Sequence, residues 1–155
     1  MQEFEIRDAY PEDGGTISEF NMKMAVETEG RDLDRETITA GVAAVLEDAS
    51  KGRYWVAEAG GKIVGQLMVT QEWSDWRNGL FWWIQSVYVE EDYRRKGVFS
   101  ALHRHVESLA RARNDICGLR LYVEHDNRRA QRTYEALGMT APGYQVMEVD
   151  FRKGS

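Results

Sequence analysis

Apolar residues recur every three to four positions in four segments of the chain, a spacing that is typical of amphipathic helices. Signals for helix ends flank these segments, because Asp or Asn caps the first N–H groups of a helix and glycine adopts the conformation that ends one. We expect the helices, in chain order, to run from Pro11 to Gly30, from the N-cap Asp34 to just before Ser50, from Gly97 to near Asn114, and from Asp126 or Asn127 to Gly138.

Alternation of apolar and polar residues predicts strands between and around these helices. The predicted strands are Phe4–Ala9, Tyr54–Glu58, Ile63–Glu72, Leu80–Val89, Leu119–Val123 and Tyr144–Phe151. Gly60-Gly61 and Asn78-Gly79 supply tight turns for two antiparallel hairpins. The helix before Leu119–Val123 lets that strand run parallel to Leu80–Val89, because parallel strands need a long crossover. The expected fold class is α/β (α+β), with a mixed, mostly antiparallel sheet flanked by helices and one parallel junction.

The length of 155 residues suits one domain over residues 1–155, and no repeat or linker-like stretch divides it. Twenty Lys and Arg against 26 Asp and Glu give a net charge of −6, which argues against nucleic-acid or anionic-membrane partners. A single cysteine cannot form an internal disulfide, and the first residues lack the pattern of a signal peptide. We expect a cytoplasmic protein, and the three histidines have no zinc-ligand spacing, so we expect no metal.

A strand, a basic turn and a helix follow one another between Gln85 and Ser100. The start of a helix offers free N–H groups and partial positive charge, and Gly97 lets the backbone pass close to a ligand. Arg94, Arg95 and Lys96 add positive charge within an acidic chain. The segment favours a pyrophosphate-binding loop, and the alternative is an ordinary solvated helix end.

A second segment follows about thirty residues later. Asn127 and Tyr134 stand seven residues apart, about two turns of a helix, so their side chains share one face with the small Ala130 between them. Such a face can contact one elongated ligand. The alternative is that Ala130, Tyr134 and Leu137 are core positions of a short helix.

With these two segments the chain resembles the GNAT superfamily of acyl-CoA-dependent N-acyltransferases over nearly its whole length. The family's phosphate-loop pattern, Gln/Arg-x-x-Gly-x-Gly/Ala, is matched from Arg94 to Val98 and broken by Phe99. The resemblance implies acetyl-CoA (coenzyme A) as co-substrate, held at the parallel junction of the sheet, and no metal. It implies that the pyrophosphate is held by Arg94, Arg95, Lys96, Gly97, Val98, Phe99 and Ser100, and the pantetheine arm by Val87, Tyr88, Val89 and Asn127.

The same resemblance implies catalytic roles. The N–H of Val87 would stabilise the oxyanion, and the hydroxyl of Tyr134 would protonate the departing thiolate. Family members often carry a glutamate on the central strand, but Phe81–Gln85 contains no acid. Glu72, at the end of the preceding strand, is the predicted substitute for the base that deprotonates the amine; the alternative is a solvated strand-end glutamate.

Three further features are open to two interpretations each. Cys117 is either an acyl-accepting nucleophile or, as we favour, a buried inert thiol. Glu27 and Glu29 either meet a cationic acceptor or, as we favour, are solvated acids near a helix end.

The third feature is a group of aromatic residues in the second hairpin, Trp73, Trp76, Phe81, Trp82 and Trp83. Alternation sends Trp82 and Trp83 to opposite faces of their strand. We expect one in the core and the other, with Trp73 or Trp76, in an acceptor pocket or a homodimer contact.

The sequence therefore predicts an N-acyltransferase that moves an acetyl group from acetyl-CoA to an amine of a small molecule or peptide, by direct attack in a ternary complex. Two alternatives stay open. The missing strand acid suits a catalytically silent acyl-CoA-binding sensor or regulatory module. A nucleotide-binding interaction domain could use the same loop for phosphate alone.

Overall fold

The computed structural model describes residues 3–152, so residues 1–2 and 153–155 of the predicted domain lie outside the described part. The chain divides into two compact units, Met1–Tyr122 and Val123–Ser155, and each is described by itself. The elements are β1 (Glu5–Asp8), α1 (Gly14–Glu29), α2 (Arg35–Glu47), β2 (Arg53–Ala59), β3 (Lys62–Ser74), β4 (Gly79–Val89), α3 (Val98–Arg111), β5 (Ile116–Leu121) and α4 (Arg128–Ala136), with single 3-10 turns at Pro11–Asp13 and Glu91–Tyr93.

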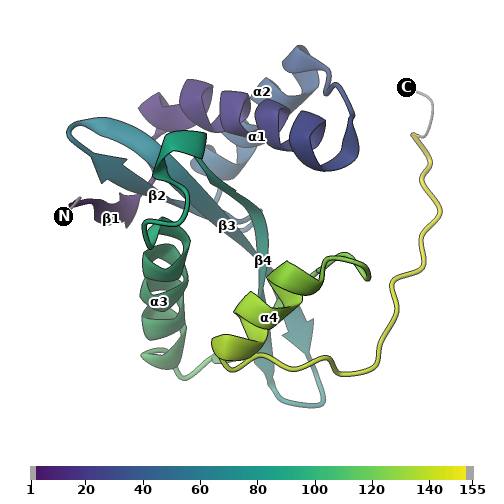
Figure 1. Ribbon diagram of the computed structural model, residues 1–155. Coiled ribbons are helices and arrows are strands. Elements are labelled where there is room, and N and C mark those ends of the chain that lie inside the picture. The colour runs from purple at the N-terminus through teal and green to yellow at the C-terminus, as the bar shows by residue number, and fades with distance from the viewer. Residues whose placement is uncertain (1–2, 153–155) are drawn as a thin grey trace. The chain divides into compact units, whose positions relative to one another are not determined.

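The five strands form one sheet in the order β1-β2-β3-β4-β5. The first four are antiparallel neighbours, and β5 runs parallel to β4 after the α3 crossover. Within the first unit, α1 and α2 lie on one face of the sheet and α3 on the other (Figure 1). The predicted mixed, mostly antiparallel sheet with one parallel junction is confirmed.

The two faces of the sheet bury separate apolar clusters. On the α3 side, Trp55 packs against Trp82, with ring centroids 5.7 Å apart, and both side chains are fully buried. On the other side, Ile17 of α1 and Val42 of α2 cover Tyr54 of β2. The sheet is thus fixed from both faces at its centre.

A β-bulge interrupts β4. Gln66 faces Tyr88 and Met68 faces Gln85, so β4 has one more residue than β3 across this stretch. Ser86 sits in the bulge with φ at 50°, in the left-handed region. Beyond the bulge, β4 pairs with β3 alone among the described residues, because its ladder with β5 covers only Leu80 to Ile84. The second half of β4 therefore keeps one open edge.

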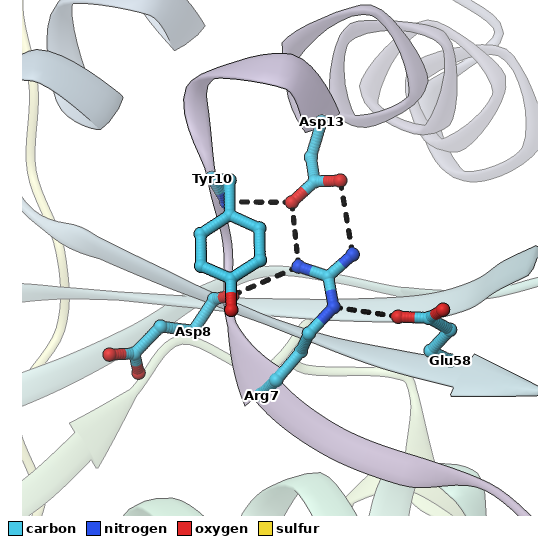
Figure 2. A network of polar contacts seen from close by, with 5 residues as sticks. All are labelled: Arg7, Asp8, Tyr10, Asp13 and Glu58. Atoms are coloured by element: carbon cyan, nitrogen blue, oxygen red, sulfur yellow. Dashed lines mark hydrogen bonds and ion pairs between the residues drawn. The ribbon is translucent and has the colours of Figure 1, made fainter. Parts of the chain in front are cut away.

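The guanidinium of Arg7 ties the first strand to the start of α1 (Figure 2). It contacts both carboxylate oxygens of Asp13, at 2.8 and 3.2 Å, and donates to Glu58 of β2 at 2.7 Å. Burial raises the pKa of Asp13, but hydrogen bonds from Arg7 and from the N–H of Tyr10 outweigh it, so the pKa lies below its usual value. The cluster anchors α1 to the sheet.

The strand predicted over Tyr144–Phe151 is wrong. Residues 144–150 have no regular secondary structure, and a turn follows at Phe151. Alternation detects side chains suited to a half-buried surface, but a strand also needs a neighbour that completes its backbone hydrogen bonds. Here Tyr144, Val146 and Met147 are exposed instead.

Other boundaries shift by a few residues. The parallel strand begins at Ile116 and ends at Leu121, so Val123 lies outside it. α3 ends at Arg111 rather than near Asn114. The predicted caps are confirmed for α1, where Gly30 ends the helix with φ at 60°, and for α2, where Asp34 accepts a hydrogen bond from the N–H of Thr37.

Candidate functional site

The basic loop connects the end of β4 to α3, and no side chain among the described residues caps the start of that helix. Gly97 occupies the N-cap of α3 with φ at 85°, and a glycine has no side chain that could cap the helix. Arg95, with φ at 64°, makes a second left-handed turn two residues earlier. The first N–H groups of α3 and the helix dipole thus suit an anion.

The open edge of β4 exposes backbone groups next to this loop. The N–H of Glu90 donates to the carbonyl of Val64 at 2.8 Å, while Val89 faces Gly65. This pattern marks a non-hydrogen-bonded pair, so the N–H and C=O of Val89 point to the open edge, and by alternation so do those of Val87. Tyr88 turns its backbone groups to β3. The open edge can accept an extended ligand as an added strand.

Arg94 is already engaged by two oxygens. Its Nη2 lies 2.8 Å from Oε1 of Glu27, and its Nε donates to the carbonyl of Val89 at 2.8 Å. The hydroxyl of Tyr88 donates to Oε2 of Glu27, also at 2.8 Å. Arg94 therefore braces the loop against α1 and β4, whereas Arg95 and Lys96 form no ion pair within residues 3–152.

These contacts change the proton affinities of the cluster. Hydrogen bonds from Tyr88 and then Arg94 lower the pKa of Glu27. Burial, followed by the hydrogen bond to Glu27, raises the pKa of Tyr88 to about 12. Glu27 is exposed near the end of α1, as favoured from the sequence, but both of its carboxylate oxygens are already engaged by Tyr88 and Arg94.

A buried polar network holds the bulge from the α1 side. The side-chain amide of Gln66 donates to the carbonyl of Ser86 and to Oδ1 of Asn21, both at 3.0 Å. Asn21 in turn donates to the hydroxyl of Tyr54 at 3.1 Å. These four residues were missed from the sequence, although one signal was present: Gln66 is a lone polar residue within the apolar run of β3.

A cavity of about 340 Å³ lies between α1, α2 and the sheet and reaches the bulge. Ser86, Asn21 and Tyr54 form its polar wall, and Glu29 also lines it. The other lining residues are mostly apolar: Met24, Ala25, Thr28, Leu33, Ile38, Gly41, Val42, Val45 and Met68. This cavity is the candidate acceptor pocket.

None of the hairpin tryptophans lines this cavity. Trp82 is in the core, as predicted for one of the pair, while Trp83 stacks on Tyr122 with ring centroids 4.5 Å apart. Trp73 and Trp76 are exposed. These tryptophans do not line the candidate cavity, so their place in an acceptor pocket or in a homodimer contact stays a prediction.

Glu72 lies in β3 opposite Phe81, five residues before the bulge in β4. That separation is about 17 Å along a strand. Its Oε1 accepts from Arg120 at 2.8 Å and from the indole N–H of Trp83 at 3.1 Å. Its role as base stays a prediction, and it would act from within this ion pair.

The second unit carries the other predicted contacts. Asn127 is the N-cap of α4, and its side chain accepts from the N–H of Ala130 at 3.0 Å. Tyr134 lies two turns along the same helix and is partly buried, which raises the pKa of its hydroxyl. It therefore keeps its proton at neutral pH, as a proton donor must.

Cys117 is the second residue of β5 and its side chain is exposed, so the expectation of a buried thiol is wrong. β5 is an edge strand of the sheet, where fewer neighbours cover a side chain. In the described part of the chain, no group of three or more His, Cys, Asp or Glu side chains could hold a metal ion. No helix among residues 3–152 is both long and apolar enough to cross a membrane.

Comparisons with known proteins agree with this geometry. Residues 17–139 match the Acetyltransferase (GNAT) family. The chain is 48% identical to a possible acetyltransferase from Clostridium difficile 630, with a TM-score of 0.90 over 95% of this chain and 97% of that chain. No curated protein sequence matches it.

Two more distant structures are similar in fold alone. One is a predicted acetyltransferase with acetyl-CoA from Clostridium acetobutylicum, 17% identical, with a TM-score of 0.75 over 96% of each chain. The other is a ribosomal-protein-alanine N-acetyltransferase from Brucella melitensis biovar Abortus 2308, 17% identical, with a TM-score of 0.77 over 96% of this chain and 99% of that chain.

Proposed function

The chain belongs to the GNAT acetyltransferase family, and on this premise we propose that it transfers the acetyl group of acetyl-CoA to a primary amine bound in the cavity between α1 and α2. The observation that carries the proposal is the open edge of β4, which runs from the bulge to the uncapped start of α3. This edge offers backbone groups to an extended arm and, at its end, N–H groups to a pyrophosphate.

The residues fit acetyl-CoA. Gly97 leaves space at the loop, since no heavy atom lies within 4 Å of a Cβ built there. Arg95, Lys96 and the first N–H groups of α3 bind the pyrophosphate, and the backbone groups of Val87 and the N–H of Val89 bind the pantetheine arm, since the carbonyl of Val89 already accepts from Arg94. Arg94 positions the loop through Glu27 and Val89. When bound, acetyl-CoA supplies an activated acyl group.

The transfer is a direct displacement. The neutral amine nitrogen forms a bond to the carbonyl carbon, the C–S bond breaks, and the N–H of Val87 stabilises the negative charge on the carbonyl oxygen. Tyr134 gives its proton to the departing sulfur, and the amine loses one proton to water. Glu72 is the proposed final acceptor of that proton, and because of its distance from the bulge it is reached only through a chain of water molecules. Asn127 holds the pantetheine arm from α4.

Calorimetry and turnover test the proposal together. We expect the protein to bind coenzyme A more tightly than ATP or NAD, and to release free thiol from acetyl-CoA only in the presence of an amine. Tight binding without turnover across a broad amine panel would favour the silent sensor. A preference for ATP or NAD would favour the nucleotide-binding domain, and either outcome rejects the acyltransferase.

A further inference from the structure

Gly41 stands within α2 at the wall of the acceptor cavity. Glycine in a helix interior is destabilising relative to alanine, because the unfolded chain has more freedom to lose. No heavy atom lies within 4 Å of a Cβ built at Gly41, so packing does not require its small size. Gly41 is exposed where it lines the cavity, so the missing side chain leaves the mouth of the cavity open.

The chemistry of the walls limits what can fill the cavity. Most of the surface comes from aliphatic and thioether side chains, among them Met24, Leu33, Ile38, Val42 and Met68. Glu29 is the single charged residue of the lining, and no Lys, Arg or His lines the cavity. An acceptor with a carboxylate or phosphate would therefore bring its charge into an apolar space without a cation to pair with it.

The polar wall fixes the orientation of an acceptor. Asn21 and Tyr54 already hydrogen-bond each other, while Ser86 places the bulge of β4 at one end of the cavity. An amine directed to Ser86 approaches the backbone of Val87, which the proposed function assigns to the oxyanion. The body of the acceptor then extends between α1 and α2, toward Gly41.

We propose that the cavity selects primary amines with an uncharged, apolar body, and that Gly41 determines how large this body can be. The inference rests on the proposed function, and names the class of acceptor for the same site. It separates alkyl- and arylalkylamines from amino acids, amino sugars and phosphorylated amines.

Matched amines test the preference. Propylamine and ethanolamine have the same size and differ in one polar atom. Hexylamine and γ-aminobutyrate have equal numbers of non-hydrogen atoms, but only γ-aminobutyrate ends in a carboxylate. We expect kcat/KM to be roughly tenfold or more higher for the apolar member of each pair, the discrimination that an apolar pocket achieves for such a change. Equal values, or a preference for ethanolamine or γ-aminobutyrate, would overturn the inference.

Gly41→Leu tests whether the apolar part of the acceptor amine extends to Gly41. The new side chain enters open space and improves helix propensity, so the variant should fold. We expect KM for hexylamine to rise roughly tenfold while KM for acetyl-CoA is unchanged. Gly15→Leu in α1 is the control, because Gly15 also has open space but does not line the cavity.

Direct binding separates this inference from the proposed function. Hexylamine should bind the wild-type protein in calorimetry, and at least about tenfold more weakly the Gly41→Leu variant, whether or not turnover occurs. No binding, or equal binding to both proteins, overturns the inference. Loss of acetyl-CoA binding and turnover with hexylamine binding intact would overturn the proposed function alone.

Discussion

The side-chain amide of Gln66 donates a hydrogen bond to the main-chain carbonyl of Ser86, 3.0 Å away, and so joins β3 to the bulge of β4. Gln66 is fully buried, and its own carbonyl oxygen has no hydrogen-bond partner within the described residues. An unpaired buried oxygen costs about 1–3 kcal/mol. The unpaired oxygen of Gln66 thus lies next to the bulge, where the backbone turns the N–H of Val87 to the open edge.

Replacing Gln66 with Met should remove this support at nearly constant volume. The carbonyl of Ser86 and the side chain of Asn21 would lose their donor, so we expect a loss of about 1 kcal/mol in the free energy of unfolding. We also expect kcat to fall severalfold more than KM for acetyl-CoA changes. Urea denaturation and steady-state kinetics measure both, with Gln71→Met, exposed on the same strand, as control. Lost stability with unchanged kcat would leave Gln66 with no positioning role.

Tyr134→Phe should lower kcat about a hundredfold with little change in the Kd of acetyl-CoA, because it removes a proton that is transferred only in the transition state. The raised pKa of Tyr134 keeps that proton in place through neutral pH. Single-turnover kinetics and calorimetry measure the two quantities. Tyr144→Phe, an exposed residue of the same unit, should change neither. An unchanged kcat would remove Tyr134 as the acid.

Gly97→Val should weaken the binding of coenzyme A before it affects the chemistry. A β-branched residue in the left-handed region costs roughly 1–2 kcal/mol, so the loop would relax away from its conformation. Gly60→Val is a matched control, since Gly60 also has a positive φ and open space but lies in the β2–β3 turn. Equal Kd values for both variants would count against the loop.

Glu27→Gln should loosen the loop and lower the pKa of Tyr88 from about 12, because the carboxylate that accepts from its hydroxyl loses its charge. Tyrosinate absorbance across an alkaline titration measures the shift, and Tyr88→Phe identifies the signal. A pKa that is raised by folding stabilises the protein below about pH 10, and this contribution is lost as the pH rises toward 12. An unchanged titration would mean that burial alone sets the pKa.

Asp13→Asn should destabilise the protein at neutral pH by about 2 kcal/mol, because Arg7 would keep Glu58 but lose the other of its two charged partners. The folded-state pKa of Asp13 lies below its unfolded value, so its contribution is present above about pH 4 and is lost as the pH falls through the folded pKa. Urea midpoints of the wild type and the variant should therefore converge in acid. Asp32→Asn, at an exposed site, should match the wild type at every pH.

Local signals were sufficient for the segments that end or begin helices. Gly30, Asp34, Gly97 and Gly138 each act through their own backbone or side chain, so their positions could be predicted from a few neighbouring residues. The parallel junction followed from the length of the crossover between β4 and β5. The basic loop could also be predicted locally, because its three basic residues and Gly97 are consecutive in the sequence.

Contacts between distant residues could not be predicted in this way. Glu27 and Arg94 are 67 positions apart, and nothing near either residue indicates that they pair. The bulge at Ser86 likewise depends on a glutamine from the neighbouring strand. For Tyr144–Phe151 the sequence predicted a strand that the structure lacks. Its residues alternate as in a strand, but no neighbouring strand in the described part of the chain pairs with them.

The ion pair between Glu27 and Arg94 connects α1, which lines the proposed acceptor cavity, with the loop proposed to bind the cofactor. Glu27 binds Arg94 of the basic loop, while Ala25 and Thr28, close to Glu27 on α1, line the cavity. If a bound amine displaced α1, this ion pair would pass the displacement on to the loop. Thermodynamic linkage makes such coupling reciprocal, so acetyl-CoA and the amine would alter each other's affinity by the same factor. The affinity for each substrate would then depend, through this one ion pair, on whether the other substrate is bound.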